Sequence, residues 1–221
     1  MAILFGVAEH TRKKIDLNVV NKENFNTPKT IILDAGHGGE DGGASSADGL
    51  LEKDLNLALV LTMRDILTAQ GAEVIVTRDT DTLLYDRNVN FEGRKKKLDA
   101  EARLKIANET ENAVFVSIHM NTYPLPSCQG VQVWYSANND ASKEVAASVR
   151  NLTNELFQPE NNREIKKSGN NIYILRHIEC PAILIECGFL SSPEEAALLA
   201  DESYRQQLAL VLCMGILRGI A

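Results

Sequence analysis

The sequence predicts a single α/β domain in which a mostly parallel, twisted β-sheet carries helices on both faces. Strand-like apolar segments alternate with helical patterns over most of the chain. The strand segments are nearly all apolar, which is typical of parallel strands that are covered on both faces. The chain has 221 residues and a mass of 24.3 kDa, a size that one domain with a substantial core accommodates.

Five short apolar runs are expected to form the strands, because they are rich in β-branched residues and bounded by polar residues, glycine or proline. The expected strands are residues 30–34, 72–78, 112–119, 130–136 and 181–189. Four longer segments repeat apolar residues at a spacing of three and four, as one face of a helix does. The expected helices are residues 52–69, 98–109, 140–157 and 204–220.

Three local signals refine the boundaries of these helices. Gly71 provides a stop after the first helix, and Asp140 is a candidate cap at the start of the third. The basic run Arg94–Lys97 lies beside acidic residues, and we interpret it as a solvated helix start rather than a ligand-binding patch.

Composition and the N-terminal segment limit the class of protein. The formal charge of −7 argues against a nucleic-acid partner, which would require a basic face. The first eight residues, MAILFGVA, are too short to span a membrane and lack a basic region before them, so they are not a complete signal peptide. Residues 1–28 are expected to be a lead or linker, and residues 29–221 the catalytic domain. The sequence leaves two origins open for the lead, the remnant of a signal sequence or residues that are not native to the protein. No transmembrane segment is expected.

The four cysteines contain no C-x-x-C pair and fall mostly in apolar runs, so buried free thiols are expected. They are Cys128, Cys180, Cys187 and Cys213.

The chemistry is expected at the carboxyl ends of the strands, where open α/β sheets bind their ligands. His37 lies in the glycine-rich stretch IILDAGHGGEDGGA, residues 31–44, which matches neither the dinucleotide fingerprint nor the P-loop. His119 ends another strand, Glu186 lies late in the last strand, and Glu52 opens the first helix. Glycines allow a large group such as a metal ion with its substrate to approach the backbone closely.

Two imidazoles and one carboxylate form the ligand set of a hydrolytic zinc, with a fourth position open to water. Zinc acidifies its water and polarises a carbonyl, so that a nearby carboxylate can act as general base. Glu186 is the candidate base, because apolar neighbours in its strand would raise its pKa. These neighbours are Ile183, Leu184, Ile185 and Phe189.

Each of these residues taken alone also has a structural interpretation. A lone histidine at a strand end is more often hydrogen bonded than a ligand, and Glu52 is a first-turn acid that the helix dipole favours. Glu186 is harder to explain in this way, because a buried carboxylate almost always has a partner. The four positions together favour a site. His10, in the lead, and His177, where a loop is expected to enter the last strand, are interpreted as residues without a catalytic role.

The motifs IILDAGHGGEDGGA, EKDLNLALV, VFVSIHMN and PAILIECGFLSSPEEAALL resemble those of the zinc-dependent N-acetylmuramoyl-L-alanine amidases, over roughly residues 30–220. The resemblance implies one zinc per chain, bound by His37, Glu52 and His119, and catalysis by Glu186. It also implies cleavage of the amide between the lactyl group of N-acetylmuramic acid and L-alanine of the peptidoglycan stem peptide. Met120 follows His119 where the family more commonly has a small residue, and we interpret this as a packing change.

The short chain without wall-binding repeats or a long site-occluding insertion is most similar to the germination-specific branch that acts on spore cortex. This resemblance implies export to the cell envelope or spore cortex, with control by an activating partner protein or by the timing of expression. Two other functions stay open from the residues. One is a zinc carboxypeptidase, in which Arg176 would bind the terminal carboxylate of a peptide, and the other is a non-catalytic wall-binding module.

Overall fold

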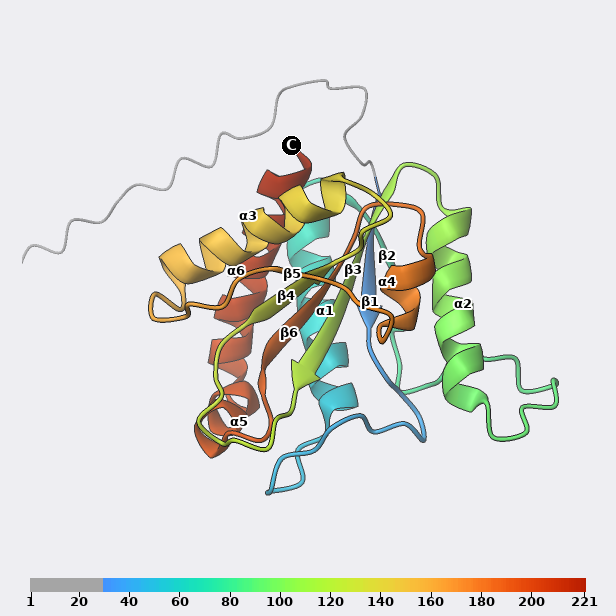
Figure 1. Cartoon of the computed structure of the whole chain (residues 1–221), viewed down its shortest axis with the longest axis horizontal. Coiled ribbons are helices and arrows are strands. Elements are labelled where there is room, and N and C mark those ends of the chain that lie inside the picture. The colour runs from blue at the N-terminus through green and yellow to red at the C-terminus, as the bar shows by residue number, and fades with distance from the viewer. Residues whose placement is uncertain (1–29) are drawn as a thin grey trace, which may run out of the picture.

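The computed structural model describes residues 30–221 and contains a six-stranded sheet between layers of helices (Figure 1). The strands follow the order β2-β1-β3-β6-β4-β5. All neighbouring strands are parallel except β4 and β6, which are antiparallel. The strands are β1 Thr30–Ala35, β2 Glu73–Val76, β3 Ala113–Asn121, β4 Gln132–Tyr135, β5 Lys166–Lys167 and β6 Ala182–Phe189. The predicted fold class, a mostly parallel α/β domain with helices on both faces, is therefore confirmed.

The helices form two layers around the sheet. The packing of α1 on β1 and β3, of α3 on β4 and β6, and of α6 on α1 and α3 places these three helices on one face (Figure 1). The other face carries α4, which contacts β6, and α2, which packs against α4. The helices are α1 Glu52–Ala69, α2 Lys95–Glu109, α3 Ala141–Leu156, α4 Tyr173–His177, α5 Pro193–Ala200 and α6 Glu202–Ile220. Two separate clusters of buried apolar side chains fill the two faces.

All five expected strands and all four expected helices are present, with boundaries shifted by a few residues. The sequence analysis did not predict β5, α4 or α5. The first two are very short, and β5 consists of two exposed lysines, which give no strand signal. The start of α5 did carry a signal, because Ser192 accepts a hydrogen bond from the Glu195 amide and Pro193 follows it.

The helix-end predictions were correct at one position and wrong at another. Gly71 follows α1 with a φ of 85°, a left-handed conformation that suits glycine at a helix stop. Asp140 precedes α3 but makes no side-chain cap hydrogen bond. The side chain of Asn139 accepts the hydrogen bond from the Ala141 amide instead.

The cysteines and the remaining histidines have no place in the predicted site. All four cysteines are free thiols; Cys187 and Cys213 are buried, whereas Cys128 and Cys180 are partly exposed, so the prediction of burial was correct for two. His177 ends α4 and is exposed, with its ring centroid 4.7 Å from that of Tyr173. It therefore does not lie at the start of a strand as expected. His10 and the expected lead, residues 1–28, lie outside the described residues.

A buried network of ion pairs between α2 and β1 fixes the carboxyl end of β1. Arg103 of α2 lies 2.6 Å from Asp34 and 2.7 Å from Asp99, and all three side chains are buried. Its guanidinium also donates to the carbonyl oxygens of Ala35 and His37, at 2.6 and 2.7 Å. The loop that follows β1 is therefore fixed by a charged group in the core rather than by apolar packing.

Replacing Arg103 with methionine is expected to lower the free energy of unfolding by about 3–5 kcal/mol, because Asp34 and Asp99 would stay buried without their cation. Urea unfolding of both proteins measures this loss. Lys105→Met removes a cation from the exposed side of the same helix, where it should cost less than about 0.5 kcal/mol. An equal effect of the two substitutions would show that the network contributes no stability.

Candidate metal centre and active site

Three predicted ligands meet at the carboxyl ends of β1 and β3. His37 lies in the loop after β1, Glu52 is the first residue of α1, and His119 lies near the end of β3. One ligand atom from each residue lies within 4.8 Å of the other two. The Oε1 atom of Glu52 is 3.2 Å from His37 Nε2 and 2.9 Å from His119 Nδ1. The site is thus assembled by three elements that are distant in sequence.

The glycines around His37 make room for these ligands. A Cβ atom on Gly36 would lie 2.3 Å from the His119 ring, and one on Gly43 would lie 2.5 Å from Glu52 Oε2. Gly43 also has a φ of 69°, which disfavours other residues. The sequence analysis expected the bare loop to admit a metal with its substrate. In the structure, the groups that approach the backbone of this loop closely are the side chains of His119 and Glu52.

His37 has an unusual backbone conformation, with a φ of 61°. Non-glycine residues in this left-handed region cost of order 1–3 kcal/mol and occur preferentially at functional sites. Hydrogen bonds from Arg103 to the His37 carbonyl and from Arg78 to the Gly36 carbonyl stabilise this conformation. The buried ion-pair network therefore contacts the backbone of His37, one of the three predicted ligands.

Asp41 orients the His37 ring. Its Oδ2 atom is 2.8 Å from His37 Nδ1, on the side of the ring opposite to Nε2, which faces Glu52. Its Oδ1 atom is 2.8 Å from the ammonium group of Lys96, in the first turn of α2. A carboxylate on the far nitrogen of a histidine fixes its tautomer and orientation, as in many zinc sites. The basic run Arg94–Lys97 is thus a helix start, as predicted, and two of its lysines, Lys95 and Lys96, also contact the glycine loop.

Glu52 is held as a carboxylate. Burial would raise its pKa, but hydrogen bonds and charge from His119 and His37 outweigh burial and hold the pKa well below its usual range. Its Oε2 atom accepts a hydrogen bond from the Ala44 amide at 2.7 Å, and Oε1 accepts one from the Met120 amide at 3.1 Å. The residue therefore does more than provide a negative charge in the first turn of α1.

Glu186 lies next to this cluster but in a different environment. It pairs with His119 across β3 and β6, and burial raises its pKa to about 6, in the direction that the sequence analysis predicted. The nearby His119 acts against this shift, and the charge of Glu52 adds to it. Its Oε2 atom is buried and has no hydrogen-bond partner within residues 30–221, although buried carboxylates were expected to have one. Of its expected apolar neighbours, Ile183 and Ile185 belong to the core on the opposite face of the sheet.

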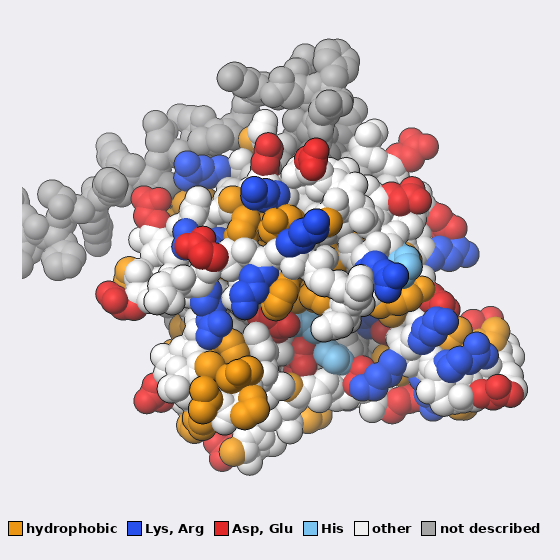
Figure 2. Space-filling model, viewed as in Figure 1, with side chains coloured by type: hydrophobic (Ala, Val, Ile, Leu, Met, Phe, Trp, Pro, Cys, Tyr) orange, Lys and Arg blue, Asp and Glu red, His pale blue; other side chains and the backbone are white. Residues whose placement is uncertain are grey.

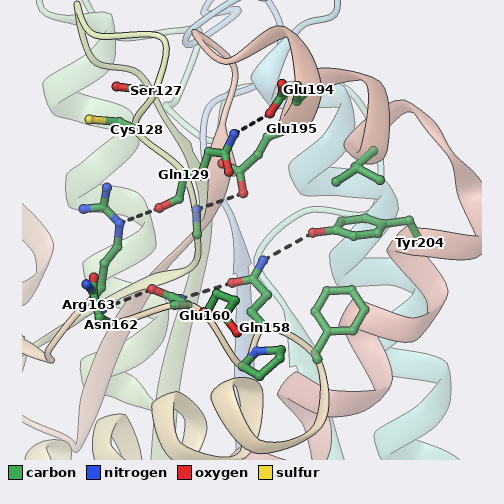
Figure 3. Close-up of a pocket in the computed structure, with 15 residues that line it drawn as sticks. Ser127, Cys128, Gln129, Gln158, Glu160, Asn162, Arg163, Glu194, Glu195 and Tyr204 are labelled. Atoms are coloured by element: carbon green, nitrogen blue, oxygen red, sulfur yellow. Dashed lines mark hydrogen bonds between the residues drawn. The ribbon is translucent and has the colours of Figure 1, made fainter.

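Two of the pockets at this end of the sheet bear on the location of the site. A pocket of about 290 Å³, which we call the α4 pocket, borders on His119 and Glu186 and extends along the sheet beneath α4. A second pocket of about 540 Å³ contains none of the four predicted site residues (Figure 3). Its polar side chains bond to one another or to the backbone: Gln158 contacts Tyr204, and Glu195 accepts from the amides of Gly130 and Phe189. The polar groups of this second pocket therefore hold the residue before β4 and the end of β6 in place through hydrogen bonds.

The donor set fits a zinc ion. Two imidazole nitrogens and one carboxylate oxygen converge, and this is the composition of a catalytic zinc site with an open position. Asp41 orients His37, and the Ala44 amide orients Glu52. A separate carboxyl group of raised pKa lies beside them. The fold and the site thus define an α/β protein with the groups that a metal-dependent hydrolase requires.

The chain belongs to the N-acetylmuramoyl-L-alanine amidases, because the sequence model of the Amidase_3 family matches residues 31–218. It is 39% identical over 190 residues to the germination-specific N-acetylmuramoyl-L-alanine amidase of Bacillus subtilis, covering 86% of this chain and 79% of the relative. N-acetylmuramoyl-L-alanine amidases cleave the peptidoglycan amide between N-acetylmuramic acid and L-alanine. The chain is therefore an amidase and a hydrolase of the cell wall.

Solved structures show the same relationship. The CwlD amidase of Clostridioides difficile, solved in complex with the GerS lipoprotein, is 38% identical with a TM-score of 0.81; the match covers 86% of this chain and 98% of that one. The amidase AmiC2 of Nostoc punctiforme is 33% identical with a TM-score of 0.71, over 86% of this chain and 95% of that one. Among the described residues, no helix is long and apolar enough to cross a membrane.

The family match excludes the carboxypeptidase and the non-catalytic module as general descriptions of the chain. Arg176, which a carboxypeptidase would need beside its substrate, is exposed in the last turn of α4. Asp41 and Arg103 were not predicted from the sequence. A signal for Asp41 was present, since it is one of two acids four residues or fewer after His37 in the glycine loop, whereas nothing local in α2 indicated that Arg103 would reach β1.

Proposed function

We propose that residues 29–221 form a zinc-dependent catalytic domain that removes stem peptides from the peptidoglycan of spore cortex. His37, Glu52 and His119 hold the zinc ion, one per chain, and Glu186 transfers the proton. The convergence of the three ligand atoms within 4.8 Å supports this proposal most directly. The similarity to a germination-specific amidase supports cortex as the substrate.

When bound, zinc acidifies a water molecule and polarises the carbonyl of the scissile amide. The residues of the chain provide the remaining functions. Glu186, with a pKa raised to about 6, takes a proton on its unpartnered Oε2 atom near neutral pH and returns it to the leaving amine of L-alanine. Asp41 and the amides of Ala44 and Met120 keep the ligands in place.

The substrate proposal is tested by incubating the protein with purified spore cortex and with vegetative peptidoglycan, then identifying the fragments by mass spectrometry. Peptides with a free N-terminal alanine should be released, and faster from cortex. Cleavage elsewhere in the stem peptide would contradict the amidase assignment. Equal rates on both walls would leave an amidase without a preference for cortex.

The peptidoglycan substrate lies outside the cytoplasmic membrane, and we propose that the chain is exported to the cell envelope or spore cortex. We also propose an activating protein partner, since a related amidase was solved with a lipoprotein. If the isolated chain binds one zinc and cleaves its substrate at full rate, no activator is required. A metal-poor or inert chain that a second protein restores would support the partner.

Replacing Asp41 with asparagine is expected to weaken zinc binding by about 10- to 100-fold, because His37 would lose the carboxylate that orients its ring. Competition with a chromophoric chelator measures the dissociation constant. Asp48→Asn makes the same charge change at an exposed position of the loop that leads into α1, and zinc affinity should be unchanged. If Asp41→Asn also binds zinc as tightly as the wild type, Asp41 does not position the ligand.

A further inference from the structure

The α4 pocket lies at the predicted reacting centre. His119 and Glu186 border on it, and among the described residues no lysine, arginine or aspartate lines it. Its other walls come from β3, β6, α2 and α4 and include Phe115, Leu184 and Ala100. A carboxylate placed there would lose its hydration without a counter-ion and would face Glu186. The pocket therefore suits a neutral group with an apolar surface.

The lysines on the α2 side of the site are already paired with acids. Lys95 contacts Glu40, and Lys96 lies 2.8 Å from Asp41. Lys53, at the start of α1, lies 2.6 Å from Asp81. These pairs neutralise the three lysines. Arg87 and Arg94, in the segment that leads into α2, are exposed and enter no ion pair among the described residues, so the α4 pocket and the sheet register, rather than charge on this side, indicate the orientation of the substrate.

The lysines of β5 differ, because no ion pair among the described residues involves Lys166 or Lys167. Both are exposed in a chain whose net charge is −7. The ammonium group of Lys166 lies 5.2 Å from the centroid of the Trp134 ring. Figure 2 shows basic side chains gathered over β4 and β5, above the recess in which histidine and acidic atoms are visible; near the start of α2, acidic and basic side chains are mixed.

The register of the sheet places Lys166 on the same face as Glu186. Gln132 pairs with Glu186, Trp134 pairs with Leu184, and Lys166 pairs with Trp134. Glu186 and Lys166 are therefore two strands and two residues apart, or about 12 Å between their Cα atoms. An extended peptide covers this distance in about three or four residues.

We propose that the substrate binds in one orientation. The neutral muramoyl group occupies the α4 pocket, and the anionic stem peptide lies over β4 and extends toward Lys166. This inference rests on the proposed amidase function. It assigns Lys166 as a residue that binds the free carboxylate of the stem peptide, and Ala100 as a wall of the muramoyl subsite.

The test uses two soluble substrates, an N-acetylmuramoyl tripeptide with a free carboxyl terminus and the same compound as its C-terminal amide. Lys166→Gln should raise KM about fivefold for the first substrate only, with kcat unchanged, because the lost contact is an exposed charge pair. Lys166→Arg should restore the wild-type KM. Lys143→Gln, on the exposed side of α3, is the control for lost charge.

The pocket is tested with Ala100→Leu, which fills part of its volume from α2. The value of kcat/KM should fall about tenfold or more for both substrates, with zinc content unchanged. The same enlargement at the exposed Ala47 should have no effect.

Three outcomes would overturn the proposal. Equal effects of Lys166→Gln on both substrates would make the residue structural. Loss of carboxylate discrimination in Lys95→Gln instead would mean that the substrate binds in the opposite direction. An unchanged kcat/KM in Ala100→Leu would show that the muramoyl group does not occupy the α4 pocket. If the wild type, loaded with zinc and supplied with any activating protein that it needs, cleaves neither substrate, the proposed function itself has failed, which is a distinct result.

Discussion

Replacing Glu186 with glutamine is expected to lower turnover by about 10²- to 10⁴-fold, the usual contribution of general acid–base catalysis. Glutamine keeps the size of glutamate but cannot take up the proton that the reaction releases. Because Glu186 is not among the three clustered ligands, the variant should fold and should bind one zinc ion. Steady-state rates on a soluble muramoyl peptide, measured with the unfolding midpoint, test both parts.

Glu179→Gln is the control for this substitution, since Glu179 is exposed just before β6 and should tolerate the change. Unchanged turnover in Glu186→Gln would remove the residue from the mechanism. A large loss of stability in Glu186→Gln would indicate that Glu186 stabilises the folded structure rather than transferring a proton.

Replacing His37 with alanine is expected to remove most of the bound zinc and to reduce turnover at least as strongly as Glu186→Gln. The substitution deletes one of three donors and leaves Asp41 and Glu52 without the imidazole between them. Elemental analysis after dialysis against trace zinc should give about one equivalent for the wild type and a small fraction of that for the variant.

His177→Ala is the matched control, because His177 is exposed on α4 and contacts only Tyr173 among the aromatic rings. It should retain a full equivalent of zinc. If His37→Ala also retained it, the ligand assignment would be wrong, and another group of the loop would have to bind the metal.

The fold was predictable because its strands and long helices carry strong periodic patterns. The apolar runs that became β1, β3 and β6 are buried along nearly their whole length. The antiparallel direction of β4 was not predicted. Residues 122–131, which connect β3 to β4, are too few for the helical crossover that a parallel strand requires. This physical reason becomes clear only once the neighbours of β4 are known.

The candidate site was predictable in its main residues, because parallel strands bring their carboxyl ends to one edge of the sheet. His37, His119 and Glu186 each lie at such an end, and Glu52 follows the loop from the first of them. The role of Glu186 as general base was argued from its apolar neighbours, whereas the assignment of Glu52 as the third zinc ligand came from resemblance to a family. These roles stay predictions.

What the sequence did not reveal were contacts between distant elements. The salt bridge of Lys96 to Asp41 and the hydrogen bond of Arg103 to the His37 carbonyl both depend on how α2 packs beside β1. The unpaired state of Lys166 likewise depends on what the other side chains contact. No local pattern encodes such contacts, and the environment of the α4 pocket follows from them.

We propose that one carboxylate of the site, Glu52, binds the metal and that the other, Glu186, moves the proton. This proposal is tested most directly by measuring zinc stoichiometry for Glu52→Gln and Glu186→Gln under identical dialysis. A neutral amide is a far poorer zinc ligand than a carboxylate, so Glu52→Gln should lose most of its zinc, while Glu186→Gln keeps about one equivalent. Loss of zinc from Glu186→Gln with retention in Glu52→Gln would exchange the two roles and contradict the account.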